Sequence, residues 1–242
     1  MAAERPLADA SAPLLLAIET AGRTPSAAVL RGPELLALER GPSGRTGAEA
    51  LLPCIDATLA RAGVQLAELD AYAVAVGPGS FTGLRVGVAT VKGLAFGSEQ
   101  PVAAVSTLAA LAHGAPKGRG PALALLDARR GEFYAAVFDV EGDEPRALPP
   151  PEGVYTPEQL VPHLPQKCVV VGDGVPLCGQ ALVRRVGPGL ALGSAEDAGA
   201  ERVGRLGQAQ LRRGETTSAA RLTPRYIRRA QAEVVRTGQA TE

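Results

Sequence analysis

The feature that most constrains the fold is a buried strand that passes through a glycine-rich turn directly into a helix. The uninterrupted apolar run Ala71–Val76 predicts a buried strand. The turn Gly77–Gly83 follows it and leads into a helix that is expected to extend to about Phe96, with Gly97 as its C-cap. A strand, a tight turn and a helix in this order indicate an α/β protein.

The same order of elements occurs twice along the chain. In the first half, Leu14–Ile18 predicts a buried strand, and Ser26–Leu30 and Leu35–Glu39 predict two strands that continue it as an antiparallel meander. In the second half, Ala122–Leu126 and Phe133–Val140 predict a hairpin. Each set is followed by a helix, a strand and another helix, so we expect a duplicated α/β unit.

Proline and glycine set the expected limits of the other elements. Because proline is tolerated only in the first turn of a helix, Pro53 predicts that the helix ending at Gly63 begins near Leu51 or Leu52. The Pro- and acid-rich segment Glu141–Gly153 predicts an irregular surface loop. The other expected elements are strands at Val102–Val105, Cys168–Val171 and Leu190–Leu192 and helices at Leu108–Ala112, Pro157–Leu164, Pro176–Arg185 and Ala195–Arg213.

We expect two lobes with short flanking segments. The first lobe is predicted to span residues 13–105 and the second residues 106–193. Residues 194–230 are expected to form a C-terminal helix and a tail that pack back on the lobes. Residues 1–12 and 231–242 are expected to be a disordered leader and a disordered tail.

Composition excludes several classes of protein. With 25 basic and 25 acidic residues the formal net charge is zero, which argues against a strongly basic nucleic-acid binder or a polybasic membrane-surface protein. Aromatic residues make up only 3% of the chain, so base-stacking platforms have little material. No apolar run approaches the length of a membrane span, and we expect a cytoplasmic protein without membrane contact.

Residues that hold metals or carry acid–base chemistry are scarce. The three cysteines are scattered without a CxxC pair, so a zinc ribbon or a dithiol redox motif is not supported. His113 and His163 are the only histidines, and neither lies beside another residue at ligand spacing. We therefore expect no metal site and no catalytic residue on this chain, and a metalloprotease is disfavoured.

Three short segments could bind an anion or a phosphate. Gly79 and Ser80 lie in the glycine-rich turn, where backbone N–H groups meet the positive end of a helix. Glu19 and Asp127 end the first strand of each half, where carboxylates could bracket a nucleotide. Each residue also has a purely structural interpretation: Ser80 caps the helix, Glu19 caps a turn, and Asp127 belongs to a charged hairpin tip.

Two glycines lie four residues apart at the start of the second helix. Gly83 and Gly87 therefore share one stripe, which would let another backbone approach closely. Spacing alone leaves open whether the partner is intramolecular or a second chain.

Several motifs together resemble the bacterial TsaB (YeaZ-like) family. They are LLLAIETA from Leu14, GPGSFTGLRVG from Gly77, VSTL from Val105, DARRGEFY from Asp127, VGDG from Val171 and PRYIR from Pro224. The resemblance runs in order along nearly the whole chain, from about Pro13 to Arg229. It implies an actin-like, sugar-kinase-like fold of two lobes, with mixed sheets flanked by helices.

The resemblance also implies a function and partners. Proteins of this family are non-catalytic partners of TsaD, which transfers threonylcarbamoyl to N6 of adenosine 37 in tRNAs that read ANN codons. The expected partners are TsaD in a heterodimer and the ATPase TsaE at the junction, with a homodimer when the chain is alone and only indirect contact with tRNA. No cofactor is expected on this chain alone, whereas ATP or ADP and a metal ion are possible in the assembled complex.

The family pairs through helices that match Leu51–Ala62 and Gly83–Phe96, so the resemblance places the interface on the first lobe. The glycine stripe would then serve an intermolecular helix bundle. The sequence departs from the family at Gly47, where a His-Ser-type start is usual, and at Glu19, where Asp is common. The expected interface residues are Leu51, Leu52, Ile55, Leu59, Gly83, Arg85, Val86, Gly87 and Thr90.

One alternative function stays open. A nucleotide-dependent kinase or ATPase of the actin-like class would use Glu19, Gly79 and Asp127 to bracket the phosphates. Binding of ATP with magnesium would distinguish it from a scaffold subunit.

Overall fold

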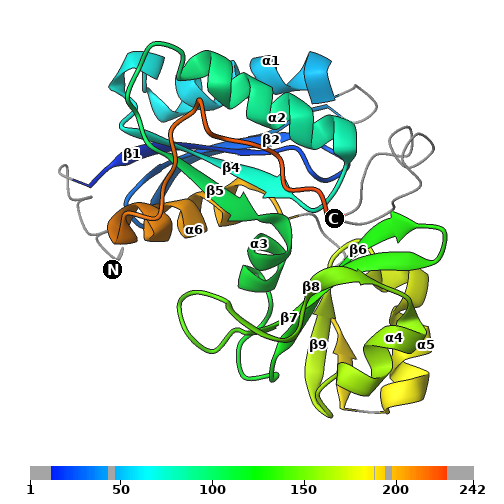
Figure 1. Ribbon diagram of the computed structural model, residues 1–242. Helices are drawn as coiled ribbons and strands as arrows, with labels where there is room; N and C mark the ends of the chain where they lie inside the picture. The colour runs from blue at the N-terminus through cyan, green and yellow to red at the C-terminus, as the bar shows by residue number, and fades with distance from the viewer. Residues whose placement is uncertain (1–11, 43–46, 188, 194–197, 228–242) are drawn as a thin grey trace.

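Two five-stranded mixed sheets built in the same strand order form the two halves of the protein (Figure 1). The structure is a computed structural model, and it describes residues 12–42, 47–187, 189–193 and 198–227. The expected disordered leader lies outside the described residues except for its last residue, and the expected disordered tail lies wholly outside them.

The first sheet has the order β3-β2-β1-β4-β5. Strands β1 to β3 are antiparallel, and β4 and β5 continue from β1 in parallel. Its strands are β1 (Leu14–Glu19), β2 (Ser26–Arg31), β3 (Glu34–Arg40), β4 (Ala71–Gly77) and β5 (Val102–Ser106).

The second sheet repeats this pattern in the order β8-β7-β6-β9-β10, again with an antiparallel meander and two parallel strands. The predicted α/β class and the predicted duplication of an α/β unit are therefore confirmed. The strands are β6 (Ala122–Arg129), β7 (Glu132–Asp139), β8 (Arg146–Tyr155), β9 (Cys168–Val171) and β10 (Leu190–Leu192).

Helices cover the faces of both sheets. Helices α1 (Gly47–Ala62) and α2 (Phe81–Leu94) lie on one face of the first sheet, and α6 (Ala200–Arg213) packs on the other. Helix α3 (Thr107–His113) lies between the two halves and contacts β6 and β7 as well as α6. The second sheet carries α4 (Pro157–Leu160) and α5 (Val175–Val186), and short 3₁₀ turns occur at Leu66–Glu68 and Val161–His163.

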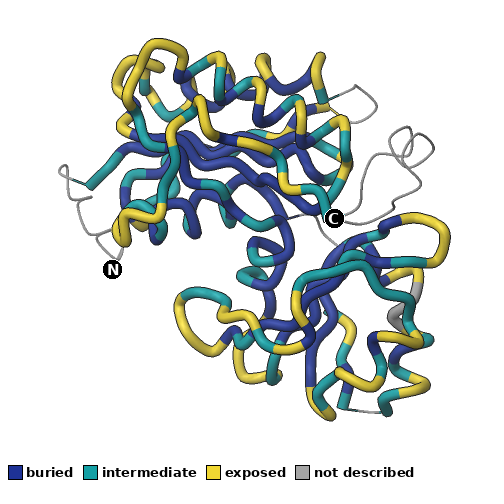
Figure 2. The backbone as a smooth tube through the Cα atoms, viewed as in Figure 1, coloured by how far each residue is buried: buried dark blue, intermediate teal, exposed yellow. Residues whose placement is uncertain are grey.

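The central strands are buried because both of their faces are covered (Figure 2). All six residues of β1 and all seven of β4 are buried. Apolar clusters lie between the first sheet and α1 and α2, between the second sheet and α5, and around α3 and α6. Buried runs of this kind are what parallel central strands require.

Two expectations about local structure are wrong. Helix α1 begins at Gly47, so Pro53 lies well inside it. The proline is on the exposed side, where the carbonyl group that it leaves without a helical donor is open to water. The segment predicted as an irregular loop contains most of β8, which is an edge strand whose pairing is interrupted around Pro149–Pro151. An edge position tolerates proline because no partner strand needs its missing N–H group.

The ends of two predicted helices also shift. Helix α2 ends at Leu94, and Gly97 lies three residues later with φ +77°. Helix α6 begins at Ala200 rather than Ala195, and residues 194–197 lie outside the described residues.

Candidate functional site

A cleft of about 830 Å³ lies between the two halves. Three of the four residues predicted to bind an anion line it, namely Gly79, Ser80 and Asp127, whereas Glu19 is not among the lining residues. Ser80 is the N-cap of α2, and its hydroxyl accepts a hydrogen bond from the backbone N–H of Gly83 at 3.2 Å. Ser80 therefore caps α2, as its structural interpretation predicted.

The two strand-end carboxylates close the turns that follow their strands. Oε1 of the buried Glu19 accepts hydrogen bonds from the backbone N–H groups of Ala21 at 2.6 Å and Gly22 at 3.0 Å. Oδ1 of Asp127 accepts one from the N–H of Arg129 at 2.7 Å, and Oδ2 pairs with its guanidinium at 3.1 Å. Oε1 of Glu19 and both carboxylate oxygens of Asp127 are thus engaged within their own turns.

The tip of the β6–β7 hairpin adds positive charge to the cleft. Arg129 and Arg130 adopt the left-handed region, with φ +70° and +59°, which is uncommon for residues other than glycine. The cleft is lined by four arginines, at 23, 129, 130 and 225, but by only two aspartates, at 127 and 173. Its lining therefore favours an anionic rather than a cationic occupant.

A C-terminal strap, residues 214–227, runs beside β5 and α2 to the cleft (Figure 1). Thr217 pairs with Val102 on the edge of the first sheet, and the N–H of Arg225 donates to the carbonyl of Val76 at 2.7 Å. The PRYIR motif thus begins in the cleft, a position that sequence reasoning did not assign. In the sequence, the PRYIR motif was the only indication that this segment matters. Its last residue, Arg228, lies outside the described residues.

Arg225 also joins the strap to the second half of the protein. Its guanidinium pairs with Glu152 of β8 at 2.8 Å, and the other carboxylate oxygen of Glu152 accepts from the Ser106 hydroxyl at 3.1 Å. Burial raises the pKa of Glu152, and the positive charge of Arg225 partly offsets that rise. The pair ties the two halves together at the cleft.

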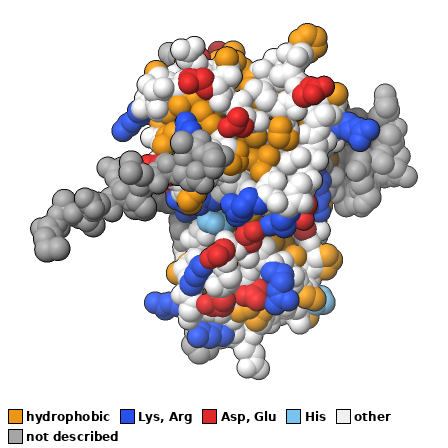
Figure 3. Space-filling view, turned by 90° about the vertical axis from the view of Figure 1, so that its left-hand side faces the viewer, with side chains coloured by type: hydrophobic (Ala, Val, Ile, Leu, Met, Phe, Trp, Pro, Cys, Tyr) orange, Lys and Arg blue, Asp and Glu red, His pale blue; other side chains and the backbone are white. Residues whose placement is uncertain are grey.

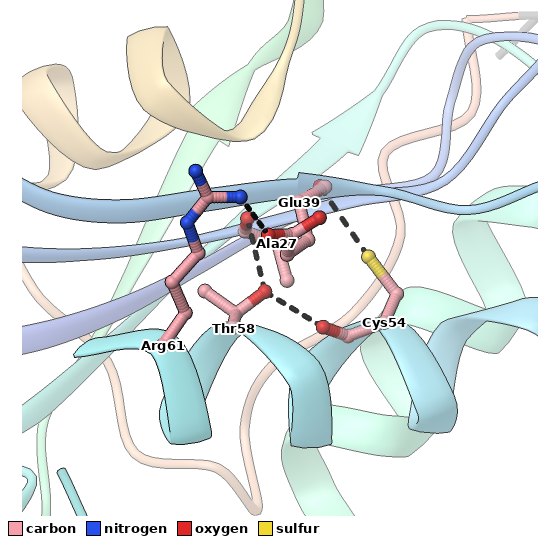
Figure 4. Close-up of polar contacts among 5 residues, drawn as sticks. All are labelled: Ala27, Glu39, Cys54, Thr58 and Arg61. Atoms are coloured by element: carbon pink, nitrogen blue, oxygen red, sulfur yellow. Dashed lines mark hydrogen bonds and ion pairs between the residues drawn. The ribbon is translucent and has the colours of Figure 1, made fainter. Parts of the chain in front are cut away.

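The inward face of α1 is committed to its own sheet (Figure 4). The buried Thr58 hydroxyl donates to the carbonyl of Cys54 at 2.7 Å and contacts the carbonyl of Ala27 on β2 at 3.4 Å. The Cys54 thiol lies 3.3 Å from the carbonyl oxygen of Glu39, whose carboxylate pairs with Arg61 at 2.7 Å. These contacts hold the helix against β2 and β3.

Four predicted interface residues are consequently not available to a second chain. Leu51, Ile55 and Leu59 are 0%, 2% and 9% exposed, because they fill the core between α1 and the first sheet. Gly87 is also buried. Placing these residues in an intermolecular interface was wrong, because helical periodicity identifies an apolar face but not what covers it.

The glycine stripe of α2 serves an intramolecular contact. The Thr20 hydroxyl donates to the carbonyl of Gly83 at 2.8 Å. A side chain at either Gly83 or Gly87 would collide with Thr20. The expectation that this stripe supports an intermolecular helix bundle is therefore wrong, and the turn after β1 is the close partner.

The outward face of α2 is small and apolar beyond Arg85, whereas that of α1 also carries the exposed charged residues Glu49, Asp56 and Arg61. Leu52 on α1 is 53% exposed, and Phe96, just after α2, is 90% exposed. Between Arg85 and Phe96 the exposed stripe of α2 carries only Ala89 and Gly93, and nothing lies within 4 Å of the position of a Cβ at Gly93. The predicted Val86 and Thr90 are half-buried beside this stripe.

A second hollow of about 470 Å³ lies between α6 and the β7–β8 loop. Basic and acidic side chains gather across the middle of the face shown in Figure 3. Arg205 pairs with Glu201 at 2.9 Å, and Arg213 of α6 pairs with Glu144 of the β7–β8 loop. Both ion pairs balance charge on this face, and the Arg213–Glu144 pair ties the two halves together a second time.

The described part of the chain contains neither a metal-binding cluster nor a membrane-spanning helix. Residues 12–42, 47–187, 189–193 and 198–227 contain no group of three or more His, Cys, Asp or Glu side chains arranged to hold a metal ion. Within these ranges, no helix has both the length and the apolar character that crossing a bilayer requires.

Comparisons with known proteins agree with this architecture. Residues 43–168, just over half of the chain, match the family model TsaD, described as tRNA N6-adenosine threonylcarbamoyltransferase. The tRNA threonylcarbamoyladenosine biosynthesis protein TsaB of Escherichia coli (strain K12) is 36% identical over 169 residues, which are 66% of this chain and 71% of that protein. The TsaB protein of Haemophilus influenzae is 42% identical over 123 residues, about half of each chain.

A solved structure covers more of the chain. YeaZ from Pseudomonas aeruginosa superposes with a TM-score of 0.77 and 32% identity, over 89% of this chain and 100% of that one. The agreement therefore extends over both sheets and their order of elements. The chain belongs to the TsaB (YeaZ-like) family, within the group of proteins that the TsaD family model describes.

Proposed function

We propose that this chain is a scaffold subunit of a cytoplasmic complex that adds threonylcarbamoyl to N6 of adenosine 37 in ANN-decoding tRNAs. It pairs with a catalytic TsaD-family subunit and activates it, and carries no catalytic residue itself. Membership of the TsaB family supports the pathway, because relatives are named for threonylcarbamoyladenosine biosynthesis. TsaE at the junction and a homodimer in isolation belong to the same proposal.

The observation that carries the pairing role is the outward face of α1 and α2. Exposed Leu52 and Phe96 flank a stretch of small side chains, so a facing helix could approach closely. Covering these side chains would remove apolar surface from water, which is the main driving force of most associations. The turn-closing engagement of Glu19 and Asp127 supports a non-catalytic subunit, because neither carboxylate is placed in the cleft as an unengaged base.

Threonylcarbamoyl transfer to tRNA from supplied threonylcarbamoyl-adenylate tests this function. Three samples are compared: this chain, the TsaD-family protein of the same organism, and both together. We expect activity only in the mixture, or much higher activity there. Activity of this chain alone would overturn the proposal.

Matched substitutions test the face itself. Leu52→Asp and Phe96→Asp place a charge where a partner would bury the side chain, so we expect both to abolish the enhancement. Leu177→Asp is the control, because Leu177 is 60% exposed but lies on α5 in the second half. Equal enhancement in all three variants would show that the partner binds elsewhere.

The competing function, a kinase or ATPase, is tested by calorimetry with ATP and magnesium. The arginine-rich lining of the cleft is the one observation that favours it. Magnesium binding would also need carboxylate oxygens, but Oε1 of Glu19 and Oδ1 of Asp127 accept from backbone N–H groups and Oδ2 of Asp127 pairs with Arg129. Saturable heat with the isolated chain would favour the enzyme over the scaffold.

A further inference from the structure

The start of α2 carries an arginine whose guanidinium stacks on the Phe81 ring and is hydrogen-bonded to Tyr226 of the C-terminal strap. The Arg85 guanidinium carbon lies 3.9 Å from the centroid of the Phe81 ring and 5.9 Å from that of Tyr226. The two rings are themselves 4.8 Å apart and inclined by 32°. Nε of Arg85 donates to the Tyr226 hydroxyl oxygen at 2.9 Å. The long side chain is thus fixed in one orientation before anything binds.

This arrangement leaves most of the donors of Arg85 unused. The side chain is exposed, and among the described residues no acceptor lies within hydrogen-bond distance of Nη1 or Nη2. Arg85 shares its stripe with Ala89, Gly93 and Phe96, so a partner that covers the small residues also covers the guanidinium. Burying a guanidinium without acceptors costs far more than the packing contacts beside it return.

We propose that Arg85, preorganised by Phe81 and Tyr226, is the specificity-determining residue of the α2 face and binds a carboxylate of the partner. The inference rests on the proposed function, because the partner is the TsaD-family subunit that covers this face. A planar guanidinium fork matches a carboxylate in a bidentate geometry, which neither a carbonyl group nor a hydroxyl reproduces. The strap thereby becomes part of the interface, although Tyr226 lies 141 positions after Arg85 in the sequence.

The strap also explains why the arginine is rigid. Lys92 of α2 donates to the carbonyl of Ala220 at 3.3 Å, one further contact that holds the strap alongside the helix. Arg225, the neighbour of Tyr226, is tied to β4 and to Glu152. Because the entropy of ordering Arg85 is lost during folding rather than during binding, the same contact gives more affinity.

Calorimetry with the TsaD-family protein of the same organism tests the proposal. We expect Arg85→Met to weaken binding by about 10- to 100-fold, as for a buried interface arginine. Arg85→Lys keeps the charge but loses the planar fork, so we expect about 5- to 20-fold weaker binding. Tyr226→Phe keeps the ring and removes only the hydroxyl that accepts the hydrogen bond from Nε of Arg85. We expect it to weaken binding by about 3-fold.

Controls separate a specific contact from damage to the fold. Arg184→Met removes an exposed helical arginine on α5, which is remote from α2, and should leave affinity within 2-fold. The thermal midpoint of free Arg85→Met should match that of the wild type, and its affinity should depend less on salt, because one charge pair is lost. Arg85→Glu should lose binding and regain it with one Asp- or Glu-to-Arg change on the partner.

The outcomes are distinguishable. If the wild type does not bind the TsaD-family protein, the proposed function fails. If the wild type binds and Arg85→Met and Arg85→Lys both bind within 2-fold of it, only the inference is overturned. If Arg85→Met does not fold, the affinities of Arg85→Lys and Tyr226→Phe decide. Each of these two substitutions changes the size of the side chain only slightly.

Discussion

Thr20, directly after β1, donates a hydrogen bond from its hydroxyl to the carbonyl of Gly83 at 2.8 Å and lies against Gly87 one turn later. The first turns of α2 therefore approach the backbone after β1 more closely than any side chain would allow. This contact places the glycine-rich turn, and with it one wall of the cleft, relative to the first sheet.

Gly87→Leu should destabilise the protein itself rather than selectively block pairing. The new side chain would collide with Thr20, and overpacking of this kind costs about 1–3 kcal/mol. Gly93→Ala is the matched control in the same helix: its Cβ meets open space, so we expect a gain of about 0.5–1 kcal/mol. Urea denaturation of both variants measures the change. A Gly87→Leu protein of wild-type stability that no longer binds its partner would return the stripe to the interface.

Glu19→Ala should lower the free energy of unfolding by about 2 kcal/mol or more. The substitution leaves the buried N–H group of Ala21 and that of Gly22 without their acceptor, and each unsatisfied buried group is costly. Glu99→Ala, at an exposed position, serves as the control and should stay within about 0.5 kcal/mol. Equal stabilities would argue that Glu19 is kept for a ligand rather than for its turn.

Arg225→Met should lower the free energy of unfolding more than Glu152→Gln does at pH 7. Removing the arginine leaves the carboxylate of Glu152, only 13% exposed, without its ion pair, and we expect a loss of about 1–2 kcal/mol. Glu152→Gln removes the charge whose burial is unfavourable and should change stability less.

The pH dependence of this pair follows from the raised pKa of Glu152. A carboxyl group with a raised pKa binds its proton more readily in the folded than in the unfolded state. The folded protein is therefore favoured at low pH, and this contribution is lost as the pH rises from the unfolded pKa through the raised folded pKa. The deficit of Arg225→Met should shrink as the pH falls through that range. Thermal melts between pH 4 and 8 check this, and a deficit independent of pH would contradict it.

Cys54 and Cys168 should resist thiol reagents in the folded protein. Burial raises the pKa of both thiols, that of Cys168 to about 12, so both thiols are mainly protonated at pH 8. Dithionitrobenzoate titration of a Cys178→Ser variant counts these two thiols alone. We expect no rapid reaction in buffer and two equivalents in guanidinium. Fast native labelling would mean that one of the two sites opens locally.

Local patterns predicted most of the elements correctly. Apolar runs marked β1, β4, β6 and β9, since central strands covered on both faces need uninterrupted apolar residues. Proline was misleading twice, at Pro53 and in β8, because its cost depends on whether the affected group is buried or exposed. Exposure at a given proline is set by the rest of the fold and not by its neighbours in sequence.

The candidate site likewise has features that the local sequence predicts and features that it does not. Ser80 as a cap and Glu19 as a turn-closing acid follow from contacts within a few residues, and both interpretations were available from the sequence. The strap could not be predicted, because Tyr226 and Arg85 are 141 positions apart and no local pattern links them. The burial of Leu51, Ile55 and Gly87 likewise depends on which face of each helix packs against the rest of the first half, and the sequence of the helix alone does not determine this.

By itself the sequence determined the duplicated order of strands and helices, the family, and the shortage of metal-binding and acid–base groups. Hydrophobic periodicity and turn residues act over short distances, so they carry that information locally. Only the tertiary structure decided that the glycine stripe faces Thr20, that Ala89 and Gly93 of α2 are exposed, and that the C-terminal strap holds Arg85. These relationships arise when distant segments pack together, and the free energy of that packing belongs to the whole fold rather than to any one segment.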